Sequence, residues 1–386
     1  MLRPSGRTVE LMLHGTGALV GPFEVELPWW QEVEAVVTSA RDHLGLDVVV
    51  LRLLEVDEER VGGRVRYLVE ERSGDTQPDR DPQPLRLSWA RPGGAQADVA
   101  WATAVLHDAG WGPVHTSVQV RTWNLSSIWR IDAGCGRAWL KVVPPFFAHE
   151  GPLVELLARR GHPVPSLIAR DRARSVFAEA AGVDGYGATA HQRLALMRAL
   201  IDVQIDVAPH TAELLAAGVP DWRAGLFAAL ADAVVTTRRD DLAGEDFDVL
   251  RALVGEIGDR FAHASSCGIP DSVTHGDAHP GNARFPADGG SWPLTILDWG
   301  DATIGSPLLD MDRMPEIREE WIAAWAAAIP GSDPAEGWRA VEPLAPLRNA
   351  VVYQRFLDQI EPTERVYHRY DVTSALRVAA ALARLR

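Results

Sequence analysis

The stretch Val273-Thr-His-Gly-Asp-Ala-His-Pro-Gly-Asn-Ala-Arg-Phe285 decides the fold of this chain, together with Leu294-Thr-Ile-Leu-Asp-Trp-Gly-Asp301, which follows it. Thr295–Leu297 of the second stretch predicts a short buried strand that delivers Asp298 at its end, and residues 269–273 predict another that leads into His275. Asp277 and Asn282 of the first stretch would then face Asp298 of the second across a small gap. Carboxylate and amide oxygens in that arrangement suit Mg²⁺ and a phosphate.

These residue types match the needs of phosphoryl transfer. Such a reaction needs a carboxylate that orients the attacking hydroxyl and accepts its proton, and hard oxygen ligands for the metal that bridges the phosphates. Asp277 fits the first role, and Asn282 with Asp298 fits the second. The competing interpretation is a metal site built from His275, Asp277 and His279 at alternate positions. The absence of further paired histidines nearby argues against that site.

The order of these residues resembles the signature of the aminoglycoside phosphotransferase and choline kinase group, relatives of the protein kinases. That signature reads His-Gly-Asp, four residues, Asn, and then Asp-x-x-Asp. The resemblance implies that Asp277 is the catalytic base, that Asn282 and Asp298 bind Mg²⁺, and that His275 braces the loop. It covers residues 116–386 and implies ATP as the phosphate donor.

The composition is typical of a folded protein, with 47% hydrophobic and 24% charged residues. A length of 386 residues allows two or three domains. The formal net charge of −15 (38 basic against 53 acidic residues) disfavours nucleic acid as a partner and favours a cationic substrate. The two cysteines lack disulfide or metal spacing, and no apolar run reaches the ~20 residues of a membrane span. We therefore expect a cytoplasmic protein without a membrane partner; the sequence does not predict its oligomeric state.

The first 112 residues predict a small α+β domain. Strands are expected at 8–13, 48–56 and 64–70, and a helix at 29–44. The layout weakly resembles a Nudix domain, whose signature needs an Arg-Glu pair and two adjacent carboxylates near the end of the helix. Thr38, Ser39, Asp42 and His43 occupy those places. The resemblance therefore implies a scaffold or sensor that has lost hydrolysis.

Residues 113–182 predict a small lobe of short alternating strands and a hinge. Strands are expected at 117–121, 127–132 and 137–143. Lys141 lies inside an apolar strand, where a charge is costly unless it is paired. The family resemblance implies that Lys141 holds the α- and β-phosphates of ATP and that Glu150, on the next helix, orients it. Glu155 is the alternative partner.

The predicted phosphate loop departs from the family pattern. The segment Trp123-Asn-Leu-Ser-Ser-Ile128 has no glycine, whereas protein kinases use several so that the backbone approaches the phosphates. Relatives among small-molecule kinases often use Ser and Asn there, which assigns phosphate contacts to the hydroxyls of Ser126 and Ser127. An ordinary hairpin turn is the alternative. In the family, a segment at the position that Glu179 marks here is the hinge, so the resemblance implies that main-chain groups of this segment recognise adenine.

Residues 183–386 predict a helical lobe that carries the catalytic loop. Helices are expected at 191–204, 226–236, 247–263, 321–329, 340–357 and 374–385. Asp310 is expected to cap a helix or brace the catalytic loop rather than react. In the family, helices such as these form the acceptor pocket. The sequence of these helices does not indicate which acceptor they bind.

The fold class that follows is α+β: a bilobal protein-kinase-like fold, with a small β-rich lobe and a large α-helical lobe, preceded by the small α+β domain. The expected function is ATP- and Mg²⁺-dependent transfer of a phosphoryl group to a hydroxyl of a small, cationic metabolite or aminoglycoside-like compound. A catalytically silent nucleotide-binding regulator of the same fold is the alternative. The missing glutamates disfavour Nudix-type hydrolysis.

Overall fold

The computed structural model describes residues 6–58, 61–73, 77–79, 81–287 and 294–385. They belong to two compact units. The β-rich unit comprises Met1–Ala148, Leu167–Glu179 and Phe356–Arg369, and the helical unit comprises His149–Ser166, Ala180–Arg355 and Tyr370–Arg386. The predicted boundaries at residues 112 and 182 stay predictions.

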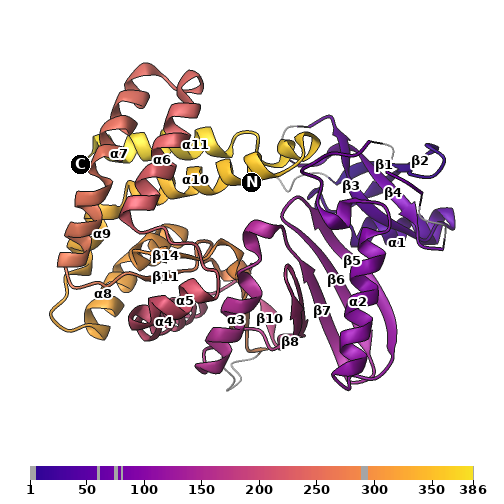
Figure 1. The fold of residues 1–386 in the computed structure, drawn as a ribbon, viewed down its shortest axis with the longest axis horizontal. Coiled ribbons are helices and arrows are strands. Elements are labelled where there is room, and N and C mark those ends of the chain that lie inside the picture. Colours follow the sequence, from indigo (N-terminus) through magenta and orange to yellow (C-terminus); the bar gives the residue numbers. More distant parts are fainter. Residues whose placement is uncertain (1–5, 59–60, 74–76, 80, 288–293, 386) are drawn as a thin grey trace. The chain divides into compact units, whose positions relative to one another are not determined.

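The first sheet of the β-rich unit has four strands, in the order β2-β1-β4-β3 (Figure 1). They are β1 (Arg7–Leu13), β2 (Leu19–Val25), β3 (Val48–Val56) and β4 (Gly63–Glu71). The central pair β1 and β4 is parallel, whereas β2 and β3 pair antiparallel with their neighbours. The sequence predicted three of these strands. The missed strand, β2, contains Gly21-Pro22 and has mostly exposed side chains, so it lacks the apolar alternation of a half-buried strand.

Helix α1 (Glu34–Leu44) packs on this sheet and begins five residues later than predicted. Its buried residues Val36, Val37 and Ala40 join the core of the sheet. The preceding residues are held by other contacts: the Trp30 indole donates to the carbonyl of Gly62 at 2.9 Å, and it is fully buried. The Nudix resemblance of this domain stays a prediction.

The second sheet of the β-rich unit has five antiparallel strands, in the order β5-β6-β7-β9-β8. They are β5 (Val114–Trp123), β6 (Ser126–Ala133), β7 (Gly136–Val142), β8 (Leu167–Asp171) and β9 (Arg174–Ala178). Helix α2 (Gly94–Asp108) lies along this sheet and buries small residues, among them Ala95 and Ala102, against it (Figure 1). The Gln119 side chain joins the two sheets, because its amide bonds both the N–H and the carbonyl of Val50 at 2.8 Å.

A segment from near the end of the chain completes the β-rich unit. The 3-10 helix η10 (Pro362–His368) packs against β3, and Val366 and Tyr367 lie against the core of the first sheet. The buried carboxylate of Glu361 accepts three hydrogen bonds from the buried guanidinium of Arg86, at 2.7–3.2 Å. Two segments 275 positions apart in sequence are therefore joined by an ion pair within one unit.

The helical unit consists of helices and two small sheets. Its helices are α3 (Glu150–Arg159), α4 (Ala190–Val207), α5 (Thr211–Ala216), α6 (Ala224–Thr237), α7 (Gly244–Ser266), α8 (Arg318–Ala328), α9 (Pro334–Val341), α10 (Leu344–Gln359, whose last residues belong to the β-rich unit) and α11 (Asp371–Arg384). Its strands are β10 (Val183–Asp184), β11 (Ser272–Thr274), β12 (Ala283–Phe285), β13 (Thr295–Ile296) and β14 (Thr303–Gly305).

Packing in the helical unit centres on α7, which lies against α6, α9 and α11 (Figure 1). The tryptophans of α8, Trp321 and Trp325, are fully buried. The prediction of a β-rich part followed by a helical part is confirmed. The two small sheets are the important departure from an all-helical unit, because they carry the catalytic-loop stretch.

Candidate active site

The loop that follows β11 is fixed by a buried carboxylate. Asp310 is 1% exposed and accepts hydrogen bonds from the backbone N–H groups of His275, at 2.7 Å, and Gly276, at 2.8 Å. The Gln204 side chain donates to the same carboxylate at 2.8 Å. Charge-assisted bonds of this kind are stronger than neutral ones. Asp310 therefore braces the loop, which was one of the two roles expected for it.

His275 is buried and neutral in this arrangement. Its Nε2 lies 2.9 Å from the carbonyl of Leu297, and its Nδ1 accepts from the backbone N–H of Asp277 at 3.3 Å. Burial lowers the pKa of the imidazole, and the nearby carboxylates oppose that effect. Because both ring nitrogens are engaged, His275 is not available as a metal ligand. Among the residues the structure describes, no three His, Cys, Asp or Glu side chains form a metal cluster.

Asp277 is held by three side chains. Its Oδ2 accepts from Nδ2 of Asn282 at 2.9 Å and lies 3.4 Å from Nε2 of His279. Its Oδ1 accepts from the guanidinium of Arg313. Burial alone would raise the pKa of Asp277, but the hydrogen bond from His279 and the charge of Arg313 outweigh it and hold the pKa well below its usual range. Asp277 is therefore ionised at any ordinary pH.

Asn282 connects Asp277 to the segment that carries Asp298. Its amide nitrogen donates to both the carbonyl, at 3.0 Å, and the carboxylate of Asp277. Its backbone carbonyl accepts from the N–H of Leu297 at 2.8 Å. The donating end of the amide thus faces Asp277, and its oxygen Oδ1 is left to act as an acceptor.

Asp298 has a backbone conformation that few side-chain-bearing residues adopt. Its φ is 63° and its ψ is 65°, in the left-handed region, and its side chain is exposed. Residues kept in such conformations concentrate at functional sites. The structure thus brings Asp277, Asn282 and the segment of Asp298 onto neighbouring turns. Their hard oxygens fit Mg²⁺, which commonly takes one or two protein ligands beside phosphates and water.

Two residues near Asp277 received no role from the sequence: Asp301, the last residue of the quoted signature, and Arg313. Burial and the negative charge of Asp277 raise the pKa of Asp301 to about 7. Arg313 lies three residues after Asp310, in Asp310-Met-Asp-Arg313. This spacing is not part of the signature, so the sequence did not single out Arg313. The only available signal was its proximity in sequence to the brace.

Lys141 and Glu150 lie where the sequence placed them, on β7 and at the start of α3. Lys141 is half-buried between β6 and β9, and Glu150 is buried. Glu155 is instead on the surface, 3.7 Å from Arg159 one turn later. Burial therefore favours Glu150 over Glu155. Because Lys141 and Glu150 belong to different units, their pairing stays a prediction.

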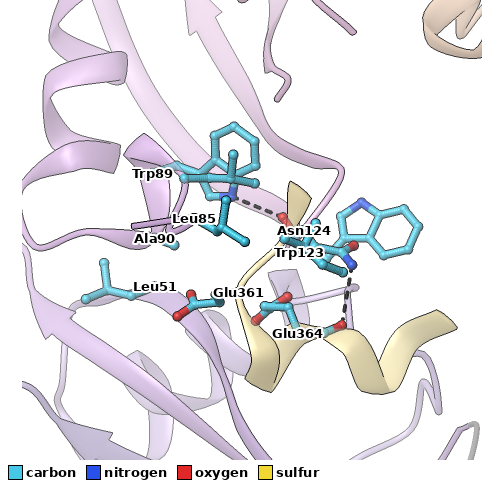
Figure 2. A pocket seen from close by; sticks show the side chains of 10 residues that line it. Leu51, Leu85, Trp89, Ala90, Trp123, Asn124, Glu361 and Glu364 are labelled. Carbon is cyan, nitrogen blue, oxygen red and sulfur yellow. Dashed lines mark hydrogen bonds between the residues drawn. The ribbon is translucent and has the colours of Figure 1, made fainter. Parts of the chain in front are cut away.

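The hairpin turn between β5 and β6 uses its hydroxyls internally. Ser126 and Ser127 are buried, and each Oγ accepts an indole N–H at 3.1 Å, from Trp123 and Trp129 respectively. In the adjacent pocket the Asn124 side chain donates to the backbone carbonyl of Glu364 at 3.4 Å (Figure 2). The structure therefore shows a packed hairpin; phosphate contacts by its serines stay a prediction.

Glu179 directly follows β9. Its backbone N–H donates to the carbonyl of Arg137 at 3.0 Å, and its exposed carboxylate lies 3.5 Å from the guanidinium of the same residue. The N–H of Glu179 is thus engaged by the neighbouring strand. A role of this segment in adenine recognition stays a prediction.

A sequence model described as the phosphotransferase enzyme family matches residues 120–344, more than half of the chain. The chain belongs to this family. It is therefore a phosphotransferase, and the predicted resemblance is confirmed. No curated protein matches the sequence significantly.

Solved structures of phosphotransferases share the fold. The GDP complex of aminoglycoside 2'-phosphotransferase-IIIa is 15% identical, covers 75% of this chain and 99% of its own, and has a TM-score of 0.50. The macrolide 2'-phosphotransferase MphH from Brachybacterium faecium is 16% identical, covers 70% of this chain and 97% of its own, and has the same TM-score. At 15% and 16% identity, this similarity shows that the folds are alike and nothing more. None of the described residues forms a helix with the length and hydropathy needed to cross a bilayer.

Proposed function

We propose that this phosphotransferase moves the γ-phosphoryl group of ATP, with Mg²⁺, to a hydroxyl of a small molecule in the cytoplasm. One observation carries the proposal: the amide of Asn282 donates twice to Asp277, while its backbone bonds the residue before Asp298. This linkage supports a base and two metal ligands acting on the same phosphate.

Each residue has a distinct task in the proposed reaction. The acceptor hydroxyl donates a hydrogen bond to Asp277, its oxygen bonds to the γ-phosphorus, and its proton passes to the Asp277 carboxylate. The bond between the γ-phosphorus and the β–γ bridging oxygen breaks, and ADP leaves. Oδ1 of Asn282 and the carboxylate of Asp298 would hold Mg²⁺, which neutralises phosphate charge when bound.

The remaining predicted residues would bind the nucleotide. Lys141 would contact the α- and β-phosphates, with Glu150 orienting it, and the segment of Glu179 would contact adenine. The buried hydroxyls of Ser126 and Ser127 would reach phosphate only if their bonds to the indoles open. Because the aminoglycoside phosphotransferase of similar fold was solved with GDP, GTP is to be compared with ATP as donor.

The acceptor is proposed to be a small metabolite or aminoglycoside-like compound that carries positive charge. The net charge of −15 attracts cations over long range and repels polyanions. This steering supports a cationic acceptor and a site without nucleic acid. Amino alcohols, amino sugars, aminoglycosides and macrolides are therefore the first compounds to screen.

The test combines an acceptor screen with a substitution. We expect ADP release that depends on Mg²⁺ and on one class of acceptor, and we expect Asp277→Ala to reduce it by about 1,000-fold or more while nucleotide binding persists. Asp202→Ala, at an exposed position of α4, is the matched control and should keep full turnover. Undiminished turnover in Asp277→Ala would refute the assignment. Nucleotide binding without turnover on any acceptor would instead indicate the regulatory alternative.

A further inference from the structure

Arg313 is fixed beside Asp277 by the same element that braces the catalytic loop. It ends the 3-10 helix Pro307–Arg313, and Asp310 of that helix holds the backbone of the loop. The backbone of Arg313 is therefore fixed relative to Asp277. The two side chains are 30% and 29% exposed, so a small ligand can approach the pair from solvent.

Arg313 contacts the oxygen that the acceptor would need. Oδ2 of Asp277 is engaged by Asn282 and lies near His279, so Oδ1 is the oxygen left for the proton of an incoming hydroxyl. That oxygen now accepts from Nη2 of Arg313. The adjacent Nε is buried and has no hydrogen-bond partner among the described residues. The Nε and Nη2 edge of a guanidinium binds two oxygens of an oxyanion, and here only one of its donors is used.

We propose that Arg313 is a catalytic residue whose guanidinium stabilises the negative charge of the γ-phosphoryl group as it is transferred. The proposal rests on the function proposed above. When Asp277 takes the proton of the acceptor, its charge is neutralised and Arg313 loses its counter-ion. At the same step, negative charge is shared by the oxygens of the phosphoryl group. The guanidinium, which does not deprotonate, then moves its hydrogen bond from Oδ1 to a phosphoryl oxygen.

Arg313 differs from a second arginine beside the catalytic loop, because the side chain of Arg313 reaches solvent. Arg348 also lies near the loop, but it is 4% exposed and donates to the backbone carbonyls of Gly276 and Asp301. Its guanidinium is committed to structure.

Three variants separate this role from a structural one. Arg313→Ala removes the cation, and Arg313→Lys keeps the charge but lacks the two-donor edge formed by Nε and Nη2. Arg318→Ala is the matched control. Arg318 has a similar exposure of 34% and pairs with Glu342 at 3.6 Å. With ATP, Mg²⁺ and the acceptor from the screen, or water as acceptor where hydrolysis is measurable, we expect kcat of Arg313→Ala to fall about 100- to 1,000-fold. The KM values for ATP and acceptor should change by less than about threefold, because the interaction forms in the transition state.

Chemical rescue distinguishes a catalytic role of Arg313 from a structural one. Millimolar guanidinium ion should restore part of the kcat of Arg313→Ala but none of that of Asp277→Ala, with KCl at equal ionic strength as the control. Arg313→Lys should retain more activity than Arg313→Ala. Thermal unfolding of all variants should stay close to that of Arg318→Ala.

The possible outcomes decide between distinct roles. A rise in kcat for Arg313→Ala would overturn the proposal, because it would show that Arg313 inhibits Asp277 from acting as the base. A loss confined to the KM of the acceptor would overturn it in favour of an acceptor-binding residue, and an equal loss in Arg318→Ala would overturn it in favour of structural support. Wild-type turnover with unchanged Arg313→Ala refutes this proposal alone. Absence of any wild-type turnover refutes the proposed function and this proposal together.

Discussion

Two short turns were expected to approach the phosphates, and they are held in different ways. In the loop that follows β11, polar side chains bond one another and the backbone, and Asn282 keeps an amide oxygen for a ligand. In the hairpin between β5 and β6, the serine hydroxyls serve tryptophan side chains, and Asn124 bonds the segment of Glu364. The difference shows that residue types alone do not define a phosphate site. The loop after β11 matched a signature in order and spacing, whereas the hairpin lacks the glycines that mark a phosphate loop.

The comparison is tested most strongly by substituting Asp298, the proposed metal ligand that follows β13 beside the loop, and Ser126 of the hairpin. Asp298→Ala should reduce kcat about 1,000-fold or more, because a metal ligand contributes several kcal/mol to the transition state. Ser126→Ala should reduce it less than about tenfold, because that hydroxyl already accepts from the Trp123 indole. ADP release at saturating ATP and Mg²⁺ measures both. Equal losses would mean that the hairpin binds phosphate as directly as the loop does.

The supports of the two turns should also differ in strength. Asp310→Ala leaves two buried backbone N–H groups without their acceptor and should cost about 3–5 kcal/mol in the free energy of unfolding. Asn124→Ala removes one long hydrogen bond, of 3.4 Å, and should cost about 1 kcal/mol. Urea denaturation of both variants at one pH gives the comparison. A larger loss for Asn124→Ala would reverse it.

A pH-dependent effect is expected in the segment that packs behind the hairpin. Burial, helped by the charge of Glu361, raises the pKa of Glu364 to about 8. The folded protein therefore keeps a proton that the unfolded chain releases near pH 4.5, so the stability this group contributes below that pH is lost as pH rises towards about 8. Between pH 6 and pH 8 the loss should be about 2 kcal/mol, an upper limit for one group.

Glu364→Gln isolates this group from the others that titrate. Asp98, with a pKa of about 6, and Asp301, at about 7, contribute to the pH dependence of both proteins. These contributions cancel when the pH dependence of the variant is subtracted from that of the wild type. The remaining pH dependence is due to Glu364 alone. Parallel curves of unfolding free energy against pH would show that Glu364 is ionised in the folded protein. In that event, further hydrogen bonds would stabilise the Glu364 carboxylate beside the one it accepts from the N–H of Leu53 at 3.1 Å.

The sequence predicted the catalytic loop and most of the strands and helices, because these depend on local patterns. The strand β3 was predicted residue for residue, since Val48–Val56 consists of Val and Leu except for Arg52 and Glu55. β8 was missed because only its first three residues, Leu167-Ile-Ala, are apolar and the hairpin that follows is Asp171-Arg-Ala-Arg174. Such edge strands are specified by their partner more than by their own composition.

Features that depend on distant contacts could not be predicted. The ion pair of Arg86 and Glu361 joins segments with no shared motif, and only the folded chain brings them together. The position of Arg313 against Asp277 depends likewise on the path of the chain after Asp310. Side-chain identity gives the chemistry of a candidate site, whereas the neighbours of each group follow from tertiary packing.

The placement of η10 has a consequence for synthesis of the protein on the ribosome. The strands β1 to β4 emerge first, yet Tyr367, which packs against their core, is translated about 300 residues later. At elongation rates of ~5–20 residues per second, that core waits roughly 15–60 s for its last member. During translation, the guanidinium of Arg86 also lacks Glu361. A chain released before residue 361 would therefore carry an incomplete amino-terminal core, and chaperones or proteases would meet it in that state.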